Sequence, residues 1–361
     1  MAMYLAKHAV VRWRARDGGV ERETRTNVVA MSSTYGNQTI EKTTMNAFRV
    51  MKWIDCANDV PLYRGASKPI ARPRRVCAEI HGESGMDHGD GTRALPSASE
   101  EEVEAKIGNA KPLVEAMYDA WLSLYESGER LVIVATGPLT NVARFVLAYE
   151  DVIEDHRRRA REGGEGRGED DVGPKIVIMG GAIGRGNTGS HAEFNIQCDP
   201  EAAQIVFDSS FEVVMVPLEV THTALATKRV IDSLEEAAMK SRTDGRQRAN
   251  QINDLLNFFR TTYSRVFGFE DPPLHDPCAV FCALMDFVNE RTDAFKDCFV
   301  GERERVDVEC KSDLTYGQTV IDFWRTSGKP NNVFVVKRMN TDHFWRAMAD
   351  AIENHVLTKR A

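Results

Sequence analysis

The sequence predicts an α/β fold in which an open, mostly parallel β-sheet is flanked by helices. Four short runs of residues are almost continuously apolar, as expected for strands that are buried on both faces. Helical stretches follow these runs, either directly or after a loop, and this alternation is typical of a parallel sheet. With 361 residues, of which 42% are hydrophobic, the chain can bury a sizeable core and fits one large domain or two small ones.

The individual elements can be assigned from these patterns. The predicted strands are residues 27–32, 131–136, 175–179 and 212–217, with later candidates at 305–310 and 332–337. The predicted helices are residues 40–55, 140–154, 199–208, roughly 228–267 and 342–355.

Two helix starts and one loop are marked by local composition. Asp199 and Asp276 are each followed by Pro, which predicts an Asp N-cap and a Pro at the first helical position, where its missing N–H costs nothing. Residues 157–173 are rich in Arg, Glu and Gly and have almost nothing to bury, so we expect a disordered surface insertion there.

Charge and composition exclude several classes of protein. The formal net charge of −8 argues against a nucleic-acid partner, which would usually require a basic patch. No apolar run approaches the ~18 residues that span a bilayer, and the first residues lack the pattern of a signal peptide, so we expect no membrane association and a cytoplasmic location. The seven cysteines are odd in number and form no CxxC pair, which predicts reduced thiols rather than disulfides or a zinc site.

Polar residues gather just after the predicted strands. In open α/β sheets, ligands bind beyond the carboxyl ends of the strands, so these positions are the candidates for a functional site. They include Asn37, Asn141, the glycine-rich stretch 180–187, Glu193, Asn195, the loop 81–85, and the pair His275 and Asp276 before a later helix.

Taken singly, each candidate has a simpler explanation. The stretch 180–187 lacks the GxGxxG spacing of a dinucleotide loop and no helix opens directly after it, and the loop 81–85 lacks the GxSxG pattern of serine hydrolases. Asp276 alone is more often a helix cap, and His275 alone a core or surface histidine. Glu193 and Asn195, on an extended segment, would point the same way and could form a solvated strand face.

Together, however, the motifs resemble one family. TYGNQTIEKTTMNAFRVM, IHGESGM, VATGPLTNVA, IMGGAIGRGN, AEFNIQCDPEAAQIVF, MVPLEVTHTAL and LHDPCAV occur in the order and approximate spacing of the inosine-uridine preferring nucleoside hydrolases. The resemblance implies a single Rossmann-like domain over residues 1–361. It also implies an enzyme of purine and pyrimidine salvage that cleaves the N-glycosidic bond of ribonucleosides to ribose and free base, with a bound Ca²⁺.

The resemblance also implies roles for particular residues. Glu193 and Asn195 match residues that hold ribose hydroxyls, with Phe194 and Ile196 facing the core and Asp199 capping the next helix. His275 matches the group that protonates the departing base, a task suited to a side chain that titrates near neutrality. The other matches are Met179, Asn187 and Asn37 around the ribose, His81 and Tyr263 at the substrate, and the Thr136 carbonyl and the Asp276 carboxylate as Ca²⁺ ligands.

One part of the family pattern has no match. The family begins with a strand and the signature D-x-D-P-G-x-D-D-A, whose aspartates bind Ca²⁺ and activate water. Here the first residues align with the helix after it, so we expect the family's first strand and these ligands to be missing; Asp87 and Asp90 do not match those positions. This leaves an alternative function, a catalytically inactive homologue that binds nucleosides or a partner subunit.

Further expectations concern specificity and assembly. Glu83 and His275 resemble the broad inosine-uridine type rather than the purine-specific one. The expected partner is a ribonucleoside substrate, and the family resemblance implies a homo-oligomer, either a dimer or a tetramer.

Overall fold

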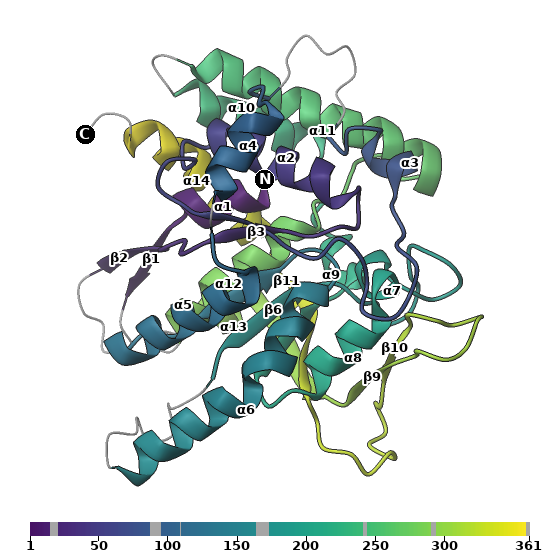
Figure 1. Ribbon diagram of the computed structural model, residues 1–361. Coiled ribbons are helices and arrows are strands. Elements are labelled where there is room, and N and C mark those ends of the chain that lie inside the picture. The colour runs from purple at the N-terminus through teal and green to yellow at the C-terminus, as the bar shows by residue number, and fades with distance from the viewer. Residues whose placement is uncertain are drawn as a thin grey trace.

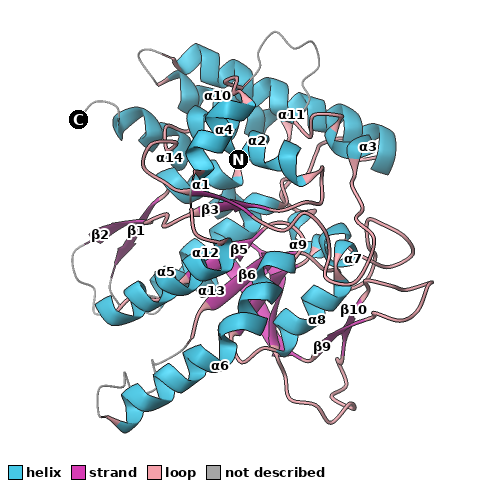
Figure 2. Ribbon diagram, in the orientation of Figure 1, coloured by secondary structure: helices cyan, strands magenta, loops and turns pink. Residues whose placement is uncertain are grey.

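A five-stranded sheet forms the centre of the computed structural model (Figures 1 and 2). The structure describes residues 1–14, 21–86, 95–108, 110–163, 173–240, 244–289 and 294–358. The strand order is β5-β6-β7-β11-β8, in which neighbours are parallel except for the antiparallel pair of β11 and β8. The strands are β5 (Val132–Ala135), β6 (Lys175–Met179), β7 (Glu212–Val216), β8 (Phe299–Glu304) and β11 (Val333–Met339). The predicted α/β class is therefore confirmed.

Three smaller sheets of two strands each accompany the central sheet. β3 (Met31–Ser33) and β4 (Leu62–Arg64) are parallel to each other. The other two pairs are antiparallel: β1 (Val10–Arg14) with β2 (Glu21–Arg25), and β9 (Val306–Val308) with β10 (Thr319–Ile321).

Helices cover both faces of the central sheet (Figure 2). In chain order they are α1 (Ala2–His8), α2 (Ile40–Trp53), α3 (Ala78–His81), α4 (Glu100–Ile107), α5 (Leu113–Ser127), α6 (Thr140–Glu162), α7 (Phe194–Cys198), α8 (Pro200–Asp208), α9 (Leu218–Thr221), α10 (Lys228–Met239), α11 (Gly245–Phe267), α12 (Asp276–Asn289), α13 (Ala294–Cys298) and α14 (Thr341–Thr358). None of these helices is long and apolar enough to cross a bilayer.

The sheet separates two hydrophobic cores, which explains why its strands are apolar throughout. On β6, Val177 and Met179 face the core that contains α1, α2, α12 and α14. Ile176 and Ile178 face the core formed with α6 and α8 on the other side. Successive side chains of a strand point to opposite faces, so both sets must be apolar.

Several predicted boundaries are wrong, for reasons of pairing and packing. Residues 27–30 are not a strand, because β3 pairs with β4 only from residue 31 onward. Residues 305–310 contribute only the short β9, which pairs with β10 outside the central sheet. The predicted helix 228–267 is two helices, α10 and α11. Gly245 at the start of α11 lies so close to α10 that a Cβ would stand 2.6 Å from the Ala238 carbonyl oxygen.

The predicted insertion at 157–173 is partly helical. Residues 157–162 continue α6. Arg157 is buried there and is paired with Glu154. Gly173 is anchored as well, because its carbonyl oxygen accepts a hydrogen bond of 3.1 Å from Arg130 Nε. Residues 164–172 lie outside the described residues.

One of the two predicted helix starts is found as predicted, and the other is shifted by one residue. Asp199 is the N-cap of α8, its carboxylate accepts from Ala202 N at 3.2 Å, and Pro200 is the first helical residue. Asp276 is itself the first residue of α12, one position later in the helix than predicted. All seven cysteines are free.

Candidate active site

Glu193 lies at the carboxyl end of β6, where it caps a short helix. Its carboxylate accepts hydrogen bonds from Asn195 N at 2.9 Å and from Gly181 N and Ile196 N at 3.1 Å each. The expectation of an extended segment is therefore wrong, because Glu193 is the N-cap of α7. Burial raises the pKa of Glu193 to about 7, although the three N–H donors favour the ionised form.

Asn195 and Asn187 join Glu193 at this end of the strand. Asn195 Nδ2 donates to the Met179 carbonyl oxygen at 3.1 Å, and Asn187 Oδ1 accepts from Phe194 N at 3.0 Å. Within the described part of the chain, these bonds leave Asn195 Oδ1 and Asn187 Nδ2 without a protein partner. The structure thus brings together four of the predicted site residues, with polar atoms still available to a ligand.

A second group of side chains surrounds His275, the residue before α12. His275 Nδ1 lies 2.7 Å from Thr221 Oγ1, and its Nε2 lies 2.8 Å from the Tyr263 hydroxyl. The His222 ring is 5.4 Å from the His275 ring, centroid to centroid. Burial, with smaller effects of His222 and His81, lowers the pKa of His275 to about 3. Burial therefore favours the neutral form of this ring in the free protein.

Asp276 connects the two groups electrostatically. Its charge raises the pKa values of both Glu193 and Tyr263, so the three side chains are neighbours. Burial raises the pKa of Asp276 itself to about 6, against the opposing charge of the Met1 amino group. Its carboxylate forms no hydrogen bond or ion pair with any described residue. A deep carboxylate of this kind is suited to a cationic ligand.

The remaining predicted residues are His81, Thr136 and Asn37. His81 ends α3, its ring is 5.9 Å from that of Phe259, and burial lowers its pKa to about 4. Gln38, which the sequence analysis did not single out, is buried and donates Nε2 to the Gly82 carbonyl oxygen at 2.9 Å, which fixes this loop. Thr136 follows β5 directly. The Asn37 carbonyl oxygen accepts a hydrogen bond from Cys77 N at 3.3 Å.

The glycine-rich stretch 180–187 does not form a phosphate loop. Three of its N–H groups donate to carboxylates: Glu193 accepts from Gly181 N, and Glu219 accepts from Ile183 N at 2.9 Å and Gly184 N at 2.8 Å. A dinucleotide site needs such N–H groups free for an anion. The structure therefore argues against the dinucleotide alternative.

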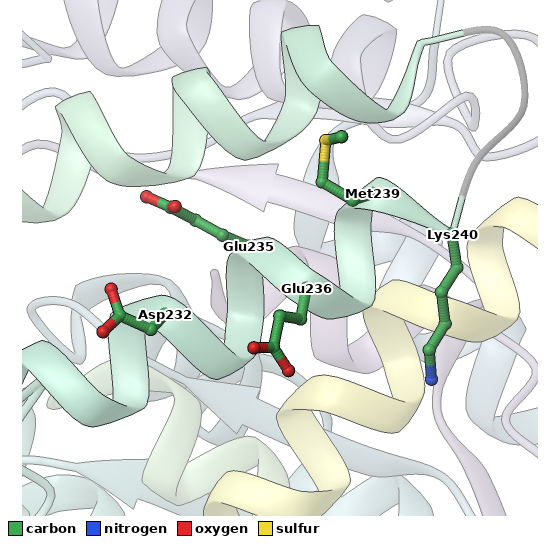
Figure 3. Close-up of a pocket in the computed structure, with 5 residues that line it drawn as sticks. All are labelled: Asp232, Glu235, Glu236, Met239 and Lys240. Carbon is green, nitrogen blue, oxygen red and sulfur yellow. The ribbon is translucent and has the colours of Figure 1, made fainter.

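Two features do not belong to this centre. A pocket of about 430 Å³ lies along α10 and is lined by Asp232, Glu235, Glu236, Met239 and Lys240 (Figure 3), none of which is a predicted site residue. Asp87 and Asp90 lie outside the described residues. In the described part of the chain, no three metal-binding side chains gather in one place.

The raised pKa of Glu193 predicts a specific pH dependence of stability. Because the folded protein holds the Glu193 proton up to about pH 7, above the unfolded value, the contribution of Glu193 to stability declines as the pH rises from about 4.5 to 7. Glu193→Gln should therefore gain stability relative to the wild type as the pH rises from about 4.5 to 7, by up to about 1.4 kcal/mol per pH unit. Urea unfolding of both proteins across this range measures the difference, and a pH-independent difference would contradict the assignment.

Comparisons with known proteins show which family the chain resembles. The family described as "Inosine-uridine preferring nucleoside hydrolase" matches residues 20–346. The chain is 34% identical over 334 residues to a "Probable ribonucleoside hydrolase" of Dictyostelium discoideum, covering 91% of this chain and 87% of that protein. It is also 34% identical over 328 residues to the "Pyrimidine-specific ribonucleoside hydrolase RihA" of Escherichia coli, covering 91% and 90%.

A solved structure shares the fold. The "Purine-Preferring Ribonucleoside Hydrolase from Gardnerella vaginalis" superposes with a TM-score of 0.72 at 23% identity, covering 98% of this chain and 94% of that one. The family match extends over most of the chain and includes Glu193, Asn195 and Asp276. The chain therefore belongs to the inosine-uridine preferring nucleoside hydrolase family.

Proposed function

We propose that this chain hydrolyses the N-glycosidic bond of ribonucleosides and releases ribose and a free purine or pyrimidine base. The proposal rests on two groups of side chains that meet around Asp276. One group is Glu193 with Asn195, and the other is His275 with Tyr263. The names of the relatives are those of hydrolases, which favours this function over binding without turnover.

At the sugar end, Asn187, Glu193 and Asn195 hold the ribose hydroxyls over Met179. Asn187 Nδ2 can donate a hydrogen bond to a ribose hydroxyl, and Asn195 Oδ1 can accept one. Glu193 is held in place by its three backbone donors. As the glycosidic bond breaks, the sugar acquires the character of an oxocarbenium ion. Hydroxyl contacts that strengthen at that stage lower the barrier.

At the base end, His275 and Tyr263 act on the departing base. The bond between the Tyr263 hydroxyl and His275 Nε2 aligns two groups that can exchange a proton with the nitrogen or oxygen atoms of a base. His81, close enough to lower the His275 pKa, completes this side. The names of the relatives include pyrimidine-specific and purine-preferring enzymes, so we propose no preference for one base class.

We propose Ca²⁺ as the metal ion of the site. The Asp276 carboxylate and the Thr136 carbonyl are hard oxygen donors of the type that Ca²⁺ prefers. These two residues fit such an ion, but they form part of a site rather than a whole one, since Ca²⁺ takes about 6 to 8 oxygens. When bound, the cation would make a coordinated water more acidic.

A cytoplasmic location and a homodimeric or homotetrameric assembly are also proposed. The location rests on the composition. The assembly rests on the family resemblance, and light scattering in solution would test it.

Asn195→Ala should depress turnover of inosine and uridine alike, because Asn195 acts on the sugar that both share. Loss of one transition-state hydrogen bond costs about 100-fold or more in kcat. The measurement is ribose release under saturating substrate. Asn257→Ala, at an exposed asparagine of α11, is the matched control. A loss confined to one base would contradict the assignment to the ribose.

His275→Ala should impair substrates with poor leaving groups far more than a nitrophenyl riboside, whose leaving group needs no proton. Tyr263→Phe removes only the partner of Nε2 and should show the same pattern more weakly. The ratio of kcat/KM for uridine and the nitrophenyl riboside is measured in each variant. Equal losses on both substrates would leave His275 as a packing residue.

Asp276→Asn should abolish stabilisation by Ca²⁺. A ligand that binds only the folded protein stabilises it by about 2.7 kcal/mol at 100 times its Kd, and this raises the melting temperature. Thermal unfolding with and without Ca²⁺ measures the effect on the wild type, on Asp276→Asn and on the control Asp232→Asn, at the exposed acid of α10. If Asp276→Asn kept the full stabilisation by Ca²⁺, the ion would bind elsewhere.

A further inference from the structure

Thr221, the last residue of α9, is a threonine to which neither the sequence motifs nor the comparisons assign a role. It is fully shielded from solvent, and its Oγ1 lies 2.7 Å from His275 Nδ1. Its backbone N donates to the Pro217 carbonyl oxygen at 3.1 Å within the short helix. Thr221 is thus a buried partner of the ring that the proposed function assigns to the departing base.

Backbone hydrogen bonds hold α9 in place on both sides. Leu218 N donates to the Gly181 carbonyl oxygen at 3.0 Å, which joins the start of α9 to the segment after β6. Leu274 N donates to the Ala224 carbonyl oxygen at 2.9 Å, which joins the segment after α9 to the residue before the histidine. The backbone therefore sets the separation of the threonine hydroxyl and the ring, and neither has to move for them to meet.

The partners of the hydroxyl and of the ring indicate where their protons lie. The Thr221 hydroxyl is 3.4 Å from the Leu218 carbonyl oxygen, which can only accept. When the single hydroxyl proton is donated to this carbonyl, Oγ1 can only accept from His275 Nδ1, which must then carry the N–H. The other nitrogen of a neutral ring, Nε2, accepts from the Tyr263 hydroxyl at 2.8 Å. Only this arrangement makes all three contacts hydrogen bonds at once.

We propose that Thr221 is a positioning residue of the site, whose hydroxyl holds the His275 ring and keeps a proton on Nδ1, so that Nε2 is the nitrogen that exchanges protons. This proposal rests on the proposed nucleoside hydrolysis and on the role of His275 in it. The hydrogen bond that one ring nitrogen makes sets the part that the other can play. Without the hydroxyl, the ring can turn about its side-chain bonds, and either nitrogen can carry the proton.

The test compares the wild type with Thr221→Val, which removes the hydroxyl at nearly constant shape, and with Thr221→Ser, which keeps it. In Thr221→Val, kcat for inosine and uridine should fall about 10- to 100-fold, the usual effect of removing a group that orients a metal-binding histidine. KM should change less than about 3-fold, because the substrate contacts remain. A nitrophenyl riboside should lose less than about 3-fold in kcat, since its leaving group departs without a proton. Thr221→Ser should stay within about 3-fold of the wild type on every substrate.

The position of the ring proton is measured separately, without substrate. Nitrogen NMR shifts of the His275 ring at neutral pH should place the proton on Nδ1 in the wild type and in Thr221→Ser. In Thr221→Val, the shifts should report a mixture of the two neutral forms. A wild-type ring with its proton on Nε2 would overturn the proposal, and this measurement decides the matter even where Thr221→Val does not fold.

Thr223→Val is the matched control, because the Thr223 hydroxyl also donates to the carbonyl oxygen three residues earlier, that of Val220, at 2.7 Å. This variant should keep the wild-type rates, and thermal unfolding verifies that all the variants fold. Unchanged nucleoside rates in Thr221→Val, equal losses on all substrates, or no recovery in Thr221→Ser would each overturn the role of Thr221. A wild type that released no ribose from any substrate would instead overturn the proposed function, whereas the NMR shifts would still show whether Thr221 fixes the ring.

Discussion

The buried carboxylate of Asp199 is the constraint on which the arrangement of the site depends. It is fully shielded from solvent and accepts hydrogen bonds from three separate parts of the chain. The donors are Ala202 N in α8, Thr140 Oγ1 at the start of α6 at 2.6 Å, and Ile70 N at 2.9 Å in the loop after β4. A buried carboxylate without such partners is very costly. Asp199 thus joins the segments that follow three strands, β4, β5 and β6.

Glu193 and Asn141 extend this set of polar connections to the neighbouring strand ends. Glu193 caps the beginning of α7 and joins it to the end of β6. Asp199 is the residue that follows α7 and caps α8, so the short helix is held at both ends. Asn141 donates Nδ2 to the Ser33 carbonyl oxygen at 3.0 Å and accepts from Ala66 N at 2.7 Å. The pair of β3 and β4 is therefore attached to the central sheet by a side chain, although its strands belong to a separate sheet. These connections place the loops of the site side by side.

The base end of the site is positioned from the other side of the sheet. α11 carries Tyr263 and is anchored near its start by the buried Arg248, which donates to the Trp53 carbonyl oxygen at 3.0 Å and contacts His355 of α14 at 2.9 Å. α12, which begins at Asp276, packs along β5, β6 and β7. A site that depends on hydrogen-bond distances requires such a frame, because small displacements of its groups weaken their action on a substrate.

The sequence by itself determined the features that depend on neighbouring residues. It predicted β6 at its observed bounds, the capped start of α8 at Asp199, and the family, whose motifs are local patterns. Only the tertiary structure decided that Glu193 caps a helix, since its partner Gly181 belongs to a different segment. Likewise, burial by distant segments keeps His275 neutral and brings His222 beside it. These properties come from contacts between residues 12 or more positions apart, and periodicity and capping signals report only on contacts within a few residues.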